Sequence, residues 1–68
     1  MALEEWQQRV IDERIDLAIR MDKLAHFLIE VAKPTGPNVT PHQSDLLYLQ
    51  LDAMRVYYRL LGMRTYLF

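Results

Sequence analysis

The sequence predicts an all-α protein: an antiparallel two-helix hairpin that assembles into a homo-oligomeric helical bundle. Residues 3–32 contain neither glycine nor proline and carry apolar residues at helical spacing. Residues 33–39 hold two prolines and a glycine, and a second apolar helix follows them. With 68 residues and no cysteine, the chain is expected to form a single domain, residues 1–68, with a modest core and no disulfide to stabilise it.

The first helix is expected over residues 3–32 because its apolar residues follow a seven-residue repeat. The repeat consists of Leu3, Val10, Leu17, Leu24 and Val31. A second apolar stripe runs beside it and consists of Ile11, Ile15, Ala18, Ala25 and Ile29. Together the stripes span roughly 200° of the helix circumference, at about 100° per residue. An amphipathic helix that packs on one partner needs only about 100° of apolar face.

The loop over residues 33–39 and the second helix over residues 41–65 follow from local signals. Lys33 precedes a proline, and this position disfavours helical backbone. Thr40, Pro41 and Gln43 match an N-cap, a first-turn proline and a capping-box partner. Gly62 either ends the helix or lies within a helix that continues to Tyr66.

Both helices carry more apolar surface than a hairpin covers, which predicts homo-oligomerisation. Each helix uses one stripe on its neighbour and has another left over. Soluble monomers rarely expose such a large apolar patch, and copies of the same chain are the simplest cover for it. We therefore expect the chain's first partner to be itself.

Composition argues against several other classes of protein. A net charge of −1 gives no global field for DNA or RNA. The apolar runs are short and interrupted by charged residues, so no membrane span is expected, and the acidic N-terminus differs from a signal peptide. These features predict a cytoplasmic protein.

The sequence also lacks the residue combinations of an enzyme. It has no cysteine, no hydroxyl residue with a suitably spaced histidine and no glycine-rich phosphate loop. His26 with Asp22 or Glu30 has helical spacing, but we interpret His26 as a residue at the border of the polar face rather than a metal ligand. We expect no catalytic residue, no metal site and no cofactor.

Arginines and aromatic residues gather in the half of the hairpin away from the loop. Five of the six arginines fall there, together with Trp6 and three tyrosines. Folding the chain back near Gly36 brings Arg9 near Arg64 and Arg14 near Arg59. Guanidinium groups suit phosphates and aromatic rings suit bases, so this half, especially between protomers, fits a small nucleotide. The candidate ligand-binding residues are Arg9, Arg14, Gln50, Tyr57, Tyr58, Arg59 and Arg64.

The same residues have structural interpretations, which spacing alone favours. Arg9 has acidic residues within helical reach and suits a surface ion pair. Tyr57 and Tyr58 suit a core or an interface. Arg14 and Gln50 fall inside apolar arcs and suit a polar layer that fixes helix register.

A resemblance adds a functional expectation. It begins in the run Gln7-Gln8-Arg9-Val10-Ile11-Asp12-Glu13. It continues through Leu17, Lys23-Leu24, Phe27-Leu28, Leu46, Gln50, Ala53-Met54, Tyr57, Leu60 and Arg64. In these residues the chain resembles a family of very short phage-encoded helical-hairpin proteins, typified by small proteins of crAss-like phages. It differs at the loop, where Pro-Thr-Gly-Pro replaces a more usual acidic turn.

By analogy with other small phage hairpins, the resemblance implies an anti-defence sponge in the cytoplasm of a bacterial host. Such a protein binds a nucleotide-derived immune signal, a cyclic nucleotide or an ADP-ribose derivative, between protomers and does not cleave it. The alternative is a small homo-oligomeric helical interaction module that docks a host or virion protein. A structural bundle without a ligand ranks behind both, because the uneven loop and an arginine within an apolar arc are unlike an idealised design.

Overall fold

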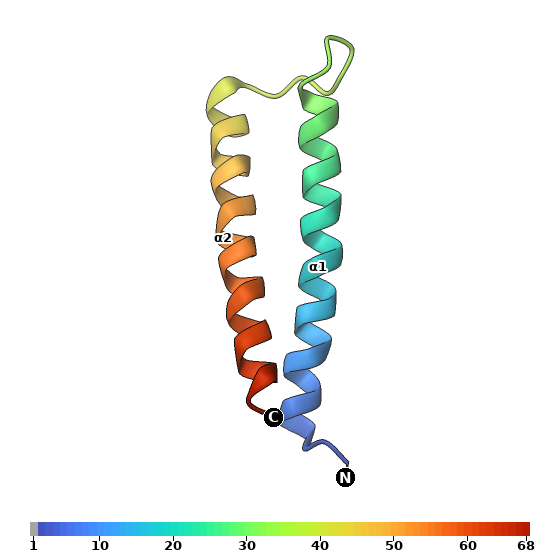
Figure 1. The fold of residues 1–68 in the computed structure, drawn as a ribbon. Coiled ribbons are helices and arrows are strands. Elements are labelled where there is room, and N and C mark those ends of the chain that lie inside the picture. Colours follow the sequence, from blue (N-terminus) through green and yellow to red (C-terminus); the bar gives the residue numbers. More distant parts are fainter. Residues whose placement is uncertain (1) are drawn as a thin grey trace.

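The computed structural model describes residues 2–68 and confirms an all-α hairpin. Helix α1 spans Glu5–Val31, helix α2 spans Pro41–Tyr66, and the two run antiparallel along their length (Figure 1). The chain forms a rod of 52 × 16 × 14 Å with both termini at the end opposite the loop. At that open end, the Trp6 and Phe68 rings meet edge to face with centroids 5.3 Å apart.

Helix α1 is slightly shorter than the sequence predicts. It begins at Glu5, two residues after the expected start, because Glu4 has extended backbone and acts as the N-cap. The Glu4 N–H donates a hydrogen bond of 2.9 Å to Oε1 of Gln7, which satisfies a backbone group at the helix start. The helix ends at Val31, ahead of Lys33 and the proline that follows it.

Helix α2 begins with the predicted capping box and extends to Tyr66. The Gln43 N–H donates to Oγ1 of Thr40 over 3.2 Å, and the Thr40 N–H donates to Oε1 of Gln43 over 3.4 Å. Gly62 lies inside the helix and does not end it. Of the two roles that the sequence allowed for Gly62, the structure shows the continuing helix.

The core is a narrow seam between the helices. Its buried side chains are Val10, Leu17, Leu28, Leu51 and Leu61. Met21, Met54 and Tyr58 are half-buried and pack against it. Val10 and Leu17 come from the predicted seven-residue repeat, whereas Leu28 lies four residues after Leu24 and outside that repeat.

Large apolar side chains remain uncovered on the outer sides of both helices. Ile15 is 54% exposed on α1, and Val56 is 64% exposed on α2. The chain exposes 5532 Å² in all. A compact monomer of 8.1 kDa exposes about 4,500 Å². The hairpin therefore carries a surplus of about 1,000 Å² of accessible surface relative to that scaling.

Across residues 2–68, neither helix combines the length and the hydropathy that crossing a membrane requires.

Candidate ligand-binding groove

One face of the hairpin carries a groove with three arginines, which we call the arginine groove. Its lining residues are Arg14, Met21, Arg55, Tyr58, Arg59, Gly62, Met63 and Tyr66. Its volume is about 610 Å³. Small-molecule sites in proteins usually have volumes of about 300–1,000 Å³, so the groove has the size of a ligand site.

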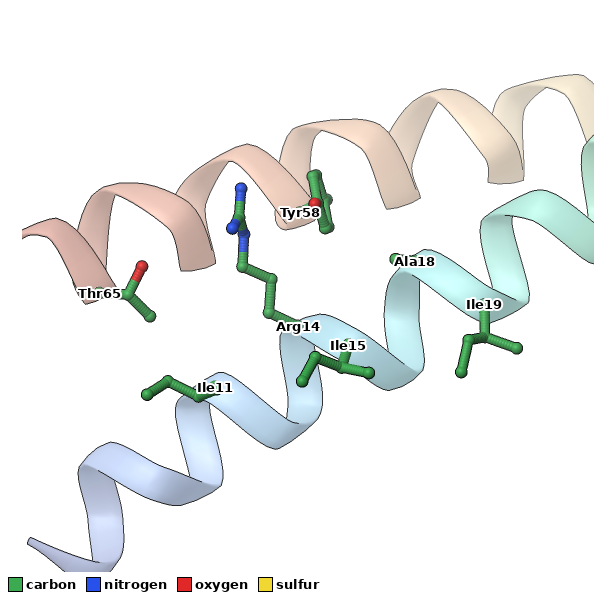
Figure 2. A pocket seen from close by; sticks show the side chains of 7 residues that line it. All are labelled: Ile11, Arg14, Ile15, Ala18, Ile19, Tyr58 and Thr65. Atoms are coloured by element: carbon green, nitrogen blue, oxygen red, sulfur yellow. The ribbon is translucent and has the colours of Figure 1, made fainter. Parts of the chain in front are cut away.

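Arg14 connects the two helices at this groove. Its side chain rises from α1 toward α2, and its Cζ lies 4.2 Å from the centroid of the Tyr58 ring (Figure 2). This is a cation–π contact, which stabilises the charge through the face of the ring. The Nε atom of Arg14 is buried and has no hydrogen-bond partner among residues 2–68. The ring therefore compensates for only part of the desolvation of this guanidinium.

Gly62 provides the space that the Arg14 guanidinium occupies. A Cβ atom at position 62 would lie 2.8 Å from Nη2 of Arg14, 3.1 Å from Cζ and 3.2 Å from Nε. These separations are shorter than ordinary contacts, so a larger residue would push the guanidinium away. Gly62 and Tyr58 are one turn apart on α2, and the guanidinium lies against both.

Arg55 and Arg59 line the groove from α2. Nη1 of Arg55 forms an ion pair of 3.2 Å with Oδ1 of Asp52, which lies outside the groove lining. Neither Arg14 nor Arg59 forms an ion pair within the described part of the chain. No carboxylate is among the described residues that line the groove. Its polar groups therefore favour an anion.

A second groove lies on the opposite face, and we call it the Tyr57 groove. It is lined by Glu13, Leu17, Arg20, Lys23, Leu24, Gln50, Met54 and Tyr57. The Tyr57 hydroxyl donates a hydrogen bond of 2.5 Å to Oε1 of Glu13 and so joins the helices. This bond is the main reason that the pKa of Tyr57 is raised above 10.0, while nearby Arg64 and Arg20 act in the opposite direction.

The seven predicted ligand residues do not share one site in the hairpin. The arginine groove contains Arg14, Tyr58 and Arg59. The Tyr57 groove contains Gln50 and Tyr57, and Arg64 lies close enough to Tyr57 to affect its pKa. Arg9 lines neither groove. It forms a 2.6 Å ion pair with Glu5, which is the surface ion pair that its spacing to acidic residues predicts.

Five residues of the arginine groove are absent from the predicted ligand residues, namely Met21, Arg55, Gly62, Met63 and Tyr66. Spacing could have revealed three of them. Positions 55, 59, 62 and 66 are separated by four, three and four residues, which places them on one face of a helix.

The described residues contain no cluster of three or more metal-ligating side chains of the His, Cys, Asp or Glu type.

Comparison with known proteins gives one family. The sequence profile of the Sequestin family matches residues 4–67, which include both helices, the loop and every residue that lines the two grooves. No curated protein and no solved structure matches the chain.

Proposed function

The chain belongs to the Sequestin family, and from that premise we propose that it binds and sequesters a nucleotide-derived signal without cleaving it. The family name denotes sequestration, which is binding rather than catalysis. Within the proposal, the protein is a phage-encoded anti-defence factor in the bacterial cytoplasm. Its ligand is an immune signal of the cyclic-nucleotide or ADP-ribose type.

The arginine groove is the observation that carries this proposal. Guanidinium groups donate paired N–H bonds that match phosphate oxygens, and tyrosine rings stack on bases. Arg14, Arg55 and Arg59 supply the first chemistry, while Tyr58 and Tyr66 supply the second. The volume of about 610 Å³ leaves space for more than a single ion.

The lining of the groove also supports binding without cleavage. Its eight described residues are arginine, methionine, tyrosine and glycine, and none is a carboxylate, histidine, cysteine or serine. Hydrolysis of a phosphodiester or a glycosidic bond usually requires a general base or a bound metal to activate water. A ligand held here contacts groups that bind charge and aromatic surface, and none of them is a usual activator of water.

Homo-oligomerisation is part of the proposal and draws support from the surplus surface. The surplus of about 1,000 Å² per chain is close to the roughly 800 Å² that each partner buries in a standard interface. Ile15 and Ile19 on α1 are about half exposed and border the arginine groove, where they line a smaller pocket that also includes Arg14. A second copy packed on this stripe would form another wall for the ligand.

The exposed apolar stripe of α1 and the exposed apolar stripe of α2 point to opposite sides of the rod. One two-fold interface therefore covers only one of them. Around α1, Ile15 projects about 160° from the buried Leu17, and around α2, Val56 projects about 140° from the buried Leu61. Each stripe therefore lies far around its helix from the buried seam. We propose that each protomer uses two interfaces and that the assembly contains more than two chains.

Calorimetric titration tests the proposed function. The purified protein is titrated with a panel of cyclic nucleotides and cyclic products of ADP-ribose. We expect at least one member to bind with a Kd below roughly 10 μM. Chromatography after heat release should then recover that member unchanged.

Two outcomes would contradict the proposal. One is that no panel member binds; a stoichiometric host or virion protein recovered with a monomeric chain would then favour the interaction module. The other is that the ligand is recovered as cleavage products.

A further inference from the structure

We propose that the Arg14 guanidinium is the anchor for a phosphoryl group of the ligand, and that the unliganded protein holds this charge without a counter-ion. The inference rests on the proposed function and names the ligand group that the arginine groove takes. Arg55 and Arg59 line the same groove and belong to the proposed phosphoryl site.

The first argument is the lack of partners around a half-buried charge. The buried Nε of Arg14 has no hydrogen-bond acceptor, and no carboxylate within residues 2–68 pairs with this side chain. Removing a charge from water is unfavourable unless hydrogen bonds and an opposite charge compensate for it. The Tyr58 ring contacts the face of the cation, so the buried Nε–H keeps no acceptor and the charge keeps no counter-ion. An anion in the groove would supply the opposite charge.

The second argument is that the guanidinium is held in place before any ligand arrives. Tyr58 and Gly62 lie against it from adjacent turns of α2 (Figure 2 shows Arg14 beside Tyr58). A fixed, planar donor loses little conformational freedom on binding, which favours affinity. The absence of a side chain at Gly62 is what permits this position.

The third argument identifies the anion as a phosphoryl group. Arg55 and Arg59 are one turn apart on α2 and line the same groove as Arg14, so up to three guanidinium groups face a single volume. A carboxylate offers two oxygens and one charge. A phosphoryl group offers three oxygens and up to two charges, which matches several guanidinium groups better. Tyr66 at the same groove leaves an aromatic surface for the remainder of the ligand.

A purely structural role for Arg14 makes a different prediction. If Arg14 only fixes the register of the helices, its replacement by methionine removes a useful contact and does not change anion binding. If Arg14 is the anchor, methionine replaces an uncompensated charge with an apolar side chain of similar length. The unliganded variant is then at least as stable as the natural chain, and the anion no longer stabilises it.

The test measures binding of inorganic pyrophosphate by calorimetry and by thermal unfolding in low-salt buffer. The natural chain should bind pyrophosphate, and its Tm should rise with pyrophosphate concentration. Arg14→Met should weaken this binding by about 10- to 100-fold, the range for losing a charged hydrogen-bonded contact. Arg20→Met is the matched control, because Arg20 is exposed and lines the Tyr57 groove on the opposite face.

A second variant keeps the test decisive if Arg14→Met fails to fold. Gly62→Ala retains every charge and suits a helix, but its Cβ displaces the Arg14 guanidinium. It should also weaken pyrophosphate binding. The proposal is overturned if the natural chain does not bind pyrophosphate, if the folded variants bind it as the natural chain does, or if Arg20→Met loses as much affinity as Arg14→Met.

The same titrations separate this inference from the proposed function. Arg14-dependent binding of pyrophosphate with no binding of any nucleotide would support the phosphoryl site and contradict the nucleotide signal. Nucleotide binding that Arg14→Met leaves unchanged would support sequestration and contradict the anchor.

Discussion

Replacing Ile15 with glutamate is expected to weaken self-association, because Ile15 lies in the middle of the exposed stripe of α1. Its side chain is 54% exposed in the hairpin, so about half of its burial remains to be gained in an assembly. Full burial of an isoleucine stabilises by about 1.5–3 kcal/mol, and half of that is roughly 0.8–1.5 kcal/mol. A two-fold interface contains the residue twice, which gives about 1.5–3 kcal/mol per interface.

This loss corresponds to an increase of roughly 10- to 100-fold in the dissociation constant, and the glutamate charge adds to it. Light scattering over a dilution series measures the effect as a shift of the dissociation midpoint to higher concentration. Lys23→Glu introduces the same residue on the polar side of α1, and its midpoint should stay within about twofold. An unchanged midpoint for Ile15→Glu, or an equal shift for Lys23→Glu, would refute the assignment of this stripe to an interface.

Three further predictions concern the stability of the hairpin. Leu61→Ala should destabilise by about 3–5 kcal/mol, because Leu61 is fully buried and the change leaves a cavity, and urea unfolding followed by circular dichroism measures this. Thr40→Ala should lower the free energy of unfolding by about 1 kcal/mol, because the N-cap of α2 is lost. Thr40→Ser keeps a capping hydroxyl and should retain most of that stability. The raised pKa of Tyr57 means that its bond to Glu13 stabilises fully below pH 10.0 and is lost as pH rises through the folded-state pKa. Tyr57→Phe should therefore be less stable near neutral pH and lose less stability above pH 10; identical pH profiles for the two proteins would contradict this.

The ends of the helices show what local signals in the sequence can determine. Thr40, Pro41 and Gln43 define the start of α2 by side-chain chemistry that acts over three residues, and the structure contains that capping box. Gly62 is different because its local meaning is ambiguous. A glycine near a helix end suits a C-cap, but here it gives space to a guanidinium from the other helix. Only the tertiary contact distinguishes the two roles.

In the candidate site, antiparallel register predicts which residues of the two helices are neighbours, but it does not predict every residue of the site. Pairing the helices about the loop predicts that Arg14 and Arg59 are neighbours, and both line the arginine groove. Register does not specify on which face a residue lies. Tyr57 and Tyr58 are adjacent in sequence but about 100° apart around the helix, and they line grooves on opposite faces. A helical projection of α2 would have placed Tyr57 and Tyr58 on different faces. It would also have added Arg55 and Tyr66 to the candidate ligand-binding residues.

Self-association of the hairpin stays a prediction. The sequence indicates it through apolar arcs wider than one partner helix covers. The structure of one chain leaves those arcs exposed, with Val56 on α2 64% accessible and Ile15 on α1 54% accessible.

Recovery of a captured ligand tests sequestration most directly. The protein is incubated with a substoichiometric amount of the nucleotide that titration identifies, the free fraction is removed by filtration, and the retained protein is heated to release its ligand. The account predicts that the filtrate is depleted, that the released nucleotide is chemically intact, and that Arg14→Met protein leaves it in the filtrate. A nucleotide that passes the filter with the natural chain, or that returns as cleavage products, would contradict it.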